Sequence, residues 1–224
     1  MQEWDEAAIR GAYDEIADAY ADHFPSTEPE QPVDLAMVEH FVAALGPDPL
    51  VLDAGCGAGR MMPFLAGLGC RIEGVDLSPG MVLRAQADHG QFPSRVASLT
   101  ELPYASRRFD GVFSWYSTIH VSDDEVAIIV RELARVLKDG GLLLVAFQTG
   151  QGVRDAGLGF RERGYDLRLL RYHRSAARMG RALRRGGFSL IASLDRVPTG
   201  SEAEGQAVLI GRRGDGRRGD EGPS

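Results

Sequence analysis

The sequence predicts an α/β fold in which a mainly parallel sheet is covered by helices on both faces. From Leu50 onward, short apolar runs alternate with segments of helical spacing, as repeated strand–helix–strand units do. A glycine-rich turn follows the first of these runs, and an aspartate, Asp76, ends the next one. A chain of 224 residues is also long enough to build such a core without disulfide or metal staples.

The N-terminal stretch is predicted to be helical. From Asp5 to His23, apolar and aromatic residues recur at helical spacing, and a proline-rich break follows. A second helix is expected from Val33 to Leu45, because Gly46-Pro47 is a usual stop signal. We expect this segment, residues 1–47, to form a lid.

The strands and helices of the sheet region follow from the alternation of patterns. The expected strands are Leu50 to Ala54, Arg71 to Asp76, Ser94 to Ala97, Phe109 to Trp115 and Leu142 to Phe147. The expected helices are Arg60 to Leu68, Pro79 to Asp88 and Asp123 to Leu137. Ser122 is placed to cap the last of these helices, and Gly140-Gly141 to supply its left-handed stop.

The last third of the chain is less regular. Residues 148–164 are glycine-rich and aperiodic, and we expect a surface insertion that borders a substrate pocket. The elements expected after it are a strand from Tyr165 to Tyr172, a helix from Ser175 to Arg185 and strands from Phe188 to Val197 and from Gly205 to Gly211. Residues 212–224 have no apolar content to bury, so they are expected to be disordered.

Composition excludes several classes of function. The formal net charge of −7 argues against a domain that tracks a phosphate backbone, so nucleic acid is not expected as a partner. Cys56 and Cys70 are too few for a disulfide framework and lack zinc-site spacing. No apolar run reaches the length of a signal sequence or a membrane span. We expect a cytoplasmic protein without a metal or a membrane partner, either a monomer or a homodimer.

The strongest local signal is the turn that follows Asp53. Gly55, Gly57 and Gly59 let the backbone turn sharply and approach a ligand, and the helix behind them offers free amides. Asp76 comes about 20 residues later, where a ribose-binding carboxylate is expected. Dinucleotide oxidoreductases share that acid, but their turn reads G-x-G-x-x-G. A carboxylate at position 53 would repel a pyrophosphate and suits a cofactor with a cationic group.

These segments resemble a known family. Residues 51–60 are similar to motif I of the class I S-adenosylmethionine-dependent methyltransferases, and residues 74–81 resemble the segment that follows it. Residues 102–114 and 133–147 resemble the third and fourth blocks, and residues 13–20 resemble the entry helix of the small-molecule type. The resemblance implies a Rossmann-like, seven-stranded sheet whose last strand is antiparallel and inserted beside its predecessors.

The resemblance also implies which residues bind the cofactor, S-adenosyl-L-methionine, and its product S-adenosyl-L-homocysteine. The methionine part would lie near Asp53 and the backbone of Ala54, Gly55 and Gly57, the ribose on Asp76, and the adenine between Leu77 and Met81. Tyr13, Tyr20 and Arg60 are candidate partners of the cofactor carboxylate. Simple core packing for the two tyrosines, and a solvated position for Arg60, remain open alternatives.

One departure from the family concerns the adenine. Many members have an acid before the Leu-Pro pair that accepts from the adenine amino group. Ser98, followed by Leu99, occupies that position here. A hydroxyl can accept the same bond, but without charge assistance.

Chemistry is expected at the end of the fourth strand, where Ser114 to Val121 would form the floor of the active site. His120 is the candidate general base, with the rate rising between about pH 6 and 7.5, and a local structural role is its alternative. Tyr116 is a candidate to orient the acceptor, and Trp115 is a candidate to line the sulfonium region or to stack on an aromatic substrate. A buried packing role is the alternative for each. His173, in an arginine-rich segment, is a candidate substrate contact for an acidic acceptor; a solvated loop is the alternative.

Together these features predict one methyltransferase domain over residues 1–211. It would consist of a helical lid (1–47), a cofactor-binding core (48–147) and substrate-side elements with the final strands (148–211). The expected activity is methyl transfer to O, N or C of a small molecule, with a role in secondary metabolism. Two alternatives remain open, namely a non-methylating S-adenosylmethionine-binding protein of this fold and a nucleotide-dependent oxidoreductase.

Overall fold

The computed structural model describes residues 5–200 and 202–215. Its first half contains α1 (Glu6–His23), α2 (Pro32–Ala43), β1 (Leu50–Ala54), α3 (Met62–Gly67), β2 (Arg71–Asp76), α4 (Pro79–Asp88), β3 (Ser94–Val96) and β4 (Phe109–Trp115). Its second half contains α5 (Asp123–Val136), β5 (Leu137–Gln148), β6 (Val153–Asp155), α6 (Leu158–Arg161), β7 (Leu170–Tyr172), α7 (Ala176–Arg185), β8 (Phe188–Arg196) and β9 (Gln206–Arg213).

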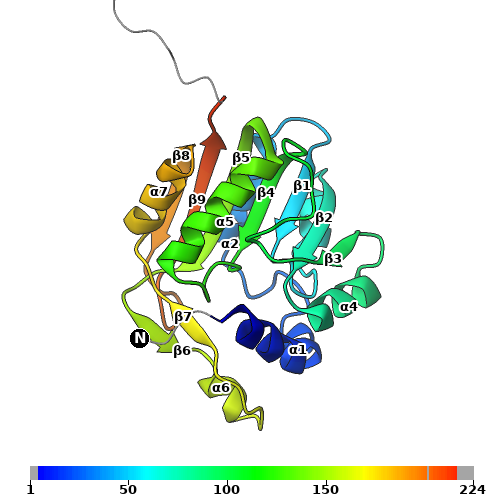
Figure 1. Cartoon of the computed structure of the whole chain (residues 1–224), viewed down its shortest axis with the longest axis vertical. Helices are drawn as coiled ribbons and strands as arrows, with labels where there is room; N and C mark the ends of the chain where they lie inside the picture. The colour runs from blue at the N-terminus through cyan, green and yellow to red at the C-terminus, as the bar shows by residue number, and fades with distance from the viewer. Residues whose placement is uncertain (1–4, 201, 216–224) are drawn as a thin grey trace, which may run out of the picture.

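The main sheet has seven strands in the order β3-β2-β1-β4-β5-β9-β8 (Figure 1). The first five strands in this order, β3, β2, β1, β4 and β5, pair in parallel with their neighbours. β9 is antiparallel to both β5 and β8 and lies between them. The expected seven-stranded sheet with an inserted antiparallel last strand is therefore confirmed.

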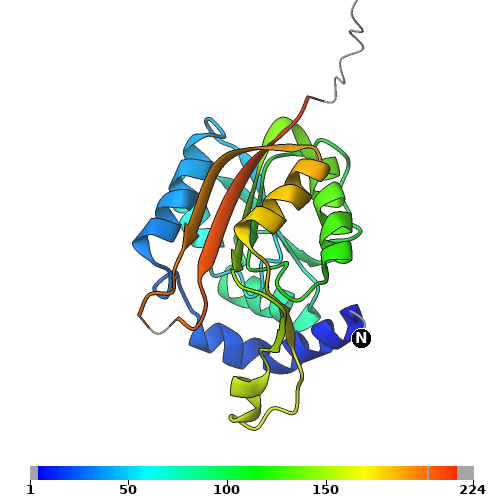
Figure 2. The same cartoon turned by 90° about the vertical axis from the view of Figure 1, so that its left-hand side faces the viewer.

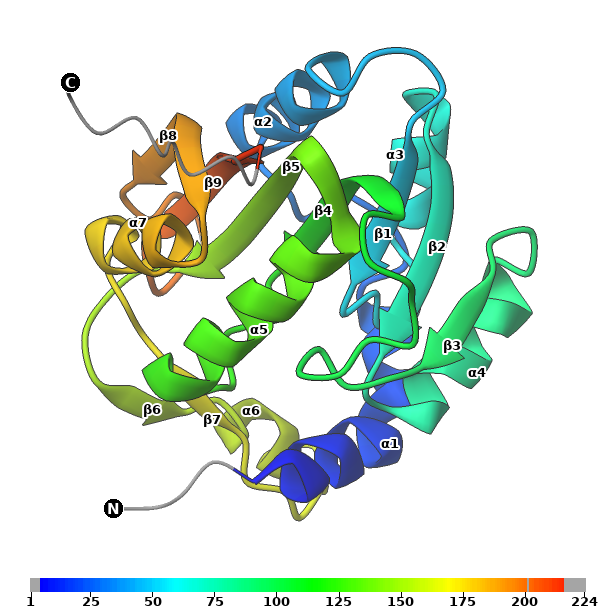
Figure 3. The ribbon, with the colours of Figure 1, turned by 45° about the horizontal axis from the view of Figure 1, so that its top comes forward.

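Helices cover both faces of this sheet. α5 and α7 pack on one face and α2 and α3 on the other (Figures 2 and 3). Successive residues of a strand point to opposite faces. Val112 therefore packs on the side of α5, and Phe113 packs on the side of α2. Both are fully buried, as expected for a parallel sheet between two helical layers.

α1 lies across the carboxyl ends of the parallel strands instead of on a face (Figure 2). Asp5 caps it by accepting from the amides of Ala7 and Ala8. Asp14 binds the start of α4 by accepting from the Ser78 hydroxyl at 2.5 Å and the Gly80 amide at 2.9 Å. These contacts fix α1 over the edge of the sheet where ligands of open α/β folds bind.

The insertion after β5 closes over α1. β6 and β7 form a two-stranded antiparallel sheet, and α6 lies between them. Leu167 and Leu169 of this insertion are buried against Ala12 and Ile16 of α1. Two segments far apart in the sequence thus cover the same end of the sheet.

Several predicted boundaries are wrong. α5 ends at Val136 and not at the glycines, because Leu137 becomes extended and pairs with Phe109. Residues 148–164 were expected to be irregular but contain β6 and α6. In residues 165–172, where a continuous strand was expected, only Leu170–Tyr172 form one. Because backbone pairing needs no apolar side chain, the first residues of the expected disordered tail, Arg212 and Arg213, continue β9. The rest of that tail, from residue 216, lies outside the described residues.

No helix in the described ranges is long and apolar enough to cross a bilayer.

Candidate active site

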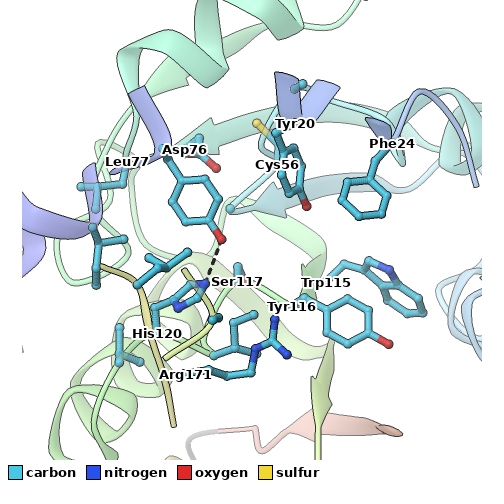
Figure 4. A pocket seen from close by; sticks show the side chains of 18 of the residues that line it. Tyr20, Phe24, Cys56, Asp76, Leu77, Trp115, Tyr116, Ser117, His120 and Arg171 are labelled. Carbon is cyan, nitrogen blue, oxygen red and sulfur yellow. Dashed lines mark hydrogen bonds between the residues drawn. The ribbon is translucent and has the colours of Figure 1, made fainter. Parts of the chain in front are cut away.

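One cavity of about 520 Å³ lies at the carboxyl ends of β1, β2 and β4, beneath α1 and the insertion. Asp53 and Asp76 line one part of it, which we call the carboxylate end. Trp115, Tyr116 and His120 line another part, which we call the aromatic end (Figure 4). The cavity therefore joins the glycine-turn region to the predicted active-site floor.

The glycine turn has the backbone that its residues predict. Gly55, Gly57 and Gly59 have φ angles of +86°, +54° and +84°, a region that side chains disfavour. A Cβ on Gly55 would lie 2.2 Å from the Cβ of Ser117, whereas one on Gly57 would meet no atom within 4 Å. Gly55 therefore also lets the turn pack against the loop that carries the aromatic end.

Asp76 is held at the end of β2 by the turn itself. One carboxylate oxygen accepts from the Gly57 amide at 2.8 Å, and the other accepts from the Ser78 amide at 2.9 Å. Burial raises the pKa of Asp76, although these amides oppose the shift. Each oxygen keeps a second lone pair for a ligand hydroxyl.

Asp53 is the less satisfied of the two carboxylates. It is 1% exposed, and its Oδ2 is buried without a partner among the described residues. Burial raises its pKa to about 7, the nearby Asp76 charge adds to the shift, and Arg60 opposes it. A buried carboxylate without a donor is costly, so this end of the cavity favours a ligand that brings a cationic or hydrogen-bond donor group.

Four of the predicted cofactor residues do not line the cavity. One is Gly57, which contributes its amide to Asp76; the other three pack behind the walls. Ala54 is fully buried in the core beside α5. Met81 packs under α1 against Ala17 and Ala58. Ser114 is fully buried and shares a 2.6 Å hydrogen bond with Ser117, which does line the cavity. Their side chains support the walls of the site.

Tyr13 and Tyr20 reach the cavity from α1, with ring centroids 6.0 Å apart in an edge-on arrangement. The same rings pack against core residues, so cavity lining and core packing both hold for them. Burial raises the pKa of each hydroxyl. Both hydroxyls therefore stay protonated.

Arg60 lines the cavity but is not a solvated residue of a first helical turn, because α3 begins only at Met62. Its guanidinium donates to the Glu30 carboxylate at 2.5 Å and to the Ser26 carbonyl at 3.3 Å. It also lies 5.9 Å from the centroid of the Phe24 ring. Much of its charge is therefore compensated within the loop that follows α1.

The surroundings of His120 define its tautomer (Figure 4). Nδ1 lies 2.6 Å from the Leu170 carbonyl, which only accepts, so Nδ1 carries the proton. Nε2 then accepts from the Tyr13 hydroxyl at 2.8 Å. Burial lowers the pKa of His120 to about 4. The expected titration between pH 6 and 7.5 is therefore wrong for this histidine, and its lone pair is already engaged.

The other two residues of the aromatic end contribute mainly rings. Trp115 stacks on Phe113 at 5.3 Å between centroids, and its Nε1 is buried without a partner in the described part of the chain. The Tyr116 hydroxyl donates to Oε1 of Gln206 at 2.9 Å, so toward a ligand it can act only as an acceptor. Tyr116 has a φ of +57°, which is costly for a bulky residue and marks a tightly constrained position.

His173 does not line the cavity, so its predicted contact with a substrate is wrong. Its ring packs against Gly150 and turns to Glu204, 3.2 Å from Nε2, and burial lowers its pKa. The neighbouring Arg171 lines the cavity in its place. Arg174 is 3% exposed and donates to the Thr118 and Val121 carbonyls, which fixes the loop that carries His120.

Sequence reasoning missed much of the cavity wall. Cys56 and Ser117 adjoin the motifs and were within reach of the sequence analysis. The remaining walls come from segments without a motif, and include Glu6, Phe24, Glu30, Gln148, Phe160, Arg163, Leu169, Arg171 and Glu202. Among the described residues, no cluster of three or more His, Cys, Asp or Glu side chains could hold a metal ion.

Comparison with known proteins agrees with this geometry. The sequence model of a family described as "Methyltransferase domain" matches residues 52–145. The chain is 33% identical to the O-methyltransferase resE of Aspergillus sclerotiorum over 103 residues, which are 43% of this chain and 38% of that protein. It is 34% identical to the ubiquinone biosynthesis O-methyltransferase of a Methylobacterium species over 121 residues, 50% of this chain and 48% of that protein. The chain thus spans less than half the length of these relatives.

A solved structure extends the likeness over most of the chain. The 1,6-didemethyltoxoflavin-N1-methyltransferase of Burkholderia thailandensis, solved with 1,6-didemethyltoxoflavin and S-adenosylhomocysteine bound, superposes with a TM-score of 0.71. The match covers 93% of this chain and 88% of that one at 22% identity. At this identity the likeness supports the fold alone.

Proposed function

The chain belongs to the class I S-adenosylmethionine-dependent methyltransferases, and we propose that it transfers a methyl group to an oxygen, nitrogen or carbon atom of a small molecule. The observation that carries the proposal is the single cavity that joins the carboxylate end to the aromatic end. One part has the groups that a nucleoside with a cationic amino acid requires. The other has an apolar, aromatic wall that suits an organic acceptor.

The cofactor is S-adenosyl-L-methionine, and S-adenosyl-L-homocysteine is its product. We assign the ribose hydroxyls to Asp76, whose free lone pairs face the cavity, and the methionine amino group to Asp53. The backbone at Gly55 and the side chains of Tyr13 and Tyr20, which line the cavity, would enclose the methionine part. The sulfonium supplies an activated methyl group, so the task of the chain is to align an acceptor with it.

The acceptor would occupy the aromatic end. Trp115 and Tyr116 line this region, and Phe160 and Leu169 of the insertion contribute apolar surface to the same cavity. Arg171 enters the same region, and its Nε is buried without a partner in the described ranges. Its terminal nitrogen binds Glu204 at 3.2 Å, which leaves the other donors for a ligand. This arrangement supports an acceptor that carries an acidic group near the methylated atom.

Proton removal by His120 is not part of the proposal. Its Nε2 accepts from Tyr13, and with a pKa of about 4 it is a weak base at neutral pH. The hydrogen bond between them instead fixes the position of the Tyr13 ring in the cavity wall. The proposed catalysis therefore rests mainly on positioning and on exclusion of water beneath α1.

The test is incubation of the purified chain with methyl-labelled S-adenosylmethionine and a panel of phenols, carboxylic acids, amines and activated carbon acids. Transfer of label to an organic product supports the proposal. Calorimetry in parallel should show binding of S-adenosylhomocysteine and no binding of NAD. Binding of S-adenosylhomocysteine with no transfer to any acceptor class would favour a non-methylating role, and binding of NAD alone an oxidoreductase.

A further inference from the structure

The first turn of α1 brings a carboxylate to the wall of the cavity. Glu6 lines the cavity together with Leu77, Ser98 and Leu99. Its Oε2 accepts from the Ser98 hydroxyl at 2.8 Å, across 92 residues of sequence. Among the described residues this is the one hydrogen bond to Glu6, and no Arg, Lys or His there forms an ion pair with it. Glu6 is therefore a free acceptor at the edge of a ligand cavity.

Ser98, by contrast, has little hydrogen-bonding capacity left. Its single hydroxyl proton points to Glu6, and its oxygen lies 2.7 Å from the Thr100 hydroxyl. The Thr100 amide also donates to the same oxygen at 3.2 Å. A hydroxyl has one donor and two acceptor lone pairs, so this one is fully used. Ser98 orients Glu6 and is not available to a ligand.

The position of Glu6 matches one group of the proposed cofactor. Leu77 lies on the opposite side of Asp76 from Trp115 and Tyr116 (Figure 4), and Ser98 and Leu99 also line the cavity. The base of a ribose held by Asp76 would fit on the side of Leu77. The edges of an adenine carry ring nitrogens, which accept, and one exocyclic amino group, which donates. An ionised carboxylate only accepts, so the amino group is the partner that fits it.

We propose that Glu6 accepts a hydrogen bond from the adenine amino group, so that the adenine-selective acid of this chain comes from the lid helix and not from the sheet. The inference rests on the proposed function, because it assumes that S-adenosylmethionine is bound with its ribose on Asp76. It also makes the first turn of α1 part of the cofactor site. Cofactor binding and docking of α1 are then coupled through one side chain.

The experiment is a double cycle between Glu6 and the amino group of the ligand. Calorimetry compares S-adenosylhomocysteine with its analogue in which purine, without the 6-amino group, replaces adenine. The wild-type chain should prefer the amino form by about tenfold or more, the range of a hydrogen bond to a charged group. Glu6→Ala should bind the two ligands with affinities within about twofold of each other. Glu6→Gln, which keeps an uncharged acceptor oxygen, should retain part of the preference.

Two controls separate the alternatives. Glu15→Gln changes an exposed carboxylate of the same helix and should keep the full preference. Ser98→Ala should keep most of it, since the acceptor remains. A wild-type preference in Glu6→Ala, or its loss in Ser98→Ala alone, would overturn the inference. If wild type bound neither ligand, the proposed function would fail first. If wild type and Glu6→Ala each bound S-adenosylhomocysteine and its purine analogue with equal affinity, only the role of Glu6 would fail.

Discussion

The carboxylate end and the aromatic end of the cavity are built in different ways. Asp53, the glycine turn and Asp76 come from one stretch of chain, and backbone amides hold Asp76 in place. The aromatic end combines Tyr13, the loop at His120 and Arg171, which come from α1, from β4 to α5 and from the insertion. The first end is a local product of one strand–turn–helix unit. The second exists only because distant segments pack together, so its shape can vary without changing the core.

This difference predicts unequal responses to substitution, with the largest at the glycine turn. Gly55→Ala should lower the free energy of unfolding by about 3 kcal/mol or more and abolish cofactor binding, because its Cβ would overlap Ser117 at a positive φ. Gly57→Ala is the matched control, since open space surrounds its Cβ, and should cost only about 1–2 kcal/mol. Chemical denaturation of both variants measures the difference. Equal losses would mean that backbone strain alone decides the effect.

The next largest effect is expected at Asp76. Asp76→Ala should weaken S-adenosylhomocysteine binding by about 1–3 kcal/mol, since it removes a charged ribose partner and the acceptor of two backbone amides. Calorimetry at pH 8 is the measurement. Asp18→Ala, which changes an exposed carboxylate of α1, should bind as wild type does. Unchanged affinity in Asp76→Ala would remove this residue from the site.

Asp53 should make binding depend on pH. Because burial raises its pKa from 3.8 to about 7, the folded chain retains a proton that the unfolded chain has lost. Its contribution therefore lowers the free energy of unfolding progressively as pH rises between those two values. A ligand ammonium group favours the ionised form, so affinity should fall below pH 7, by up to about tenfold per pH unit.

Asp53→Asn separates this effect from other titrations. The variant should bind S-adenosylhomocysteine with little dependence on pH between 5.5 and 8, about the window in which Asp53 titrates. In the absence of ligand, the same variant should also lose less stability than wild type as pH rises through that window. A variant with the wild-type pH dependence of affinity would assign the titration to another group.

At the aromatic end, the Tyr13–His120 pair should have a moderate effect. Tyr13→Phe and His120→Ala should each lower turnover by about three- to tenfold, and the double variant by about the same factor, because one hydrogen bond links them. With saturating cofactor, His120 should contribute no pH dependence between 6 and 7.5, as it is neutral throughout. A loss of about a hundredfold in His120→Ala, with a shifted pH profile, would instead assign it the role of a base.

The smallest expected effect is in the lid. Amide exchange in α1 should slow by a few fold when S-adenosylhomocysteine binds, since Tyr13 and Tyr20 would contact the ligand. The buried strand β4 serves as the internal control and should not change. Identical exchange of α1 with and without ligand would show that this helix is part of the fixed scaffold.

Structural features that depend on neighbouring residues could be predicted from the sequence. The bounds of β1, β2, β4 and α4 agree with the prediction, because each is a continuous apolar or periodic run with clear ends. The positive φ angles of the glycine turn and the position of Asp76 beside it follow from the same short segment. Ser122 caps the helix expected of it.

The pairing and protonation of a side chain could not be predicted where they depend on a partner elsewhere in the chain. Nothing near His120 in the sequence indicates that Tyr13 occupies its lone pair or that Leu170 takes its proton. Nor does the sequence show that Glu204 binds both Arg171 and His173, or that of these two only Arg171 lines the cavity.

The local pattern of strands, glycines and aspartates was thus enough to predict the α/β class, the ligand-binding edge and the carboxylate end, because the backbone conformation of the turn follows from short-range chemistry. The antiparallel last strand was predicted from the family resemblance. Which side chains face the acceptor, which are neutralised by partners and where Glu6 lies were decided only by packing of α1 and the insertion on that edge. Burial and pairing set the charge of these groups, and both are properties of contacts between distant segments.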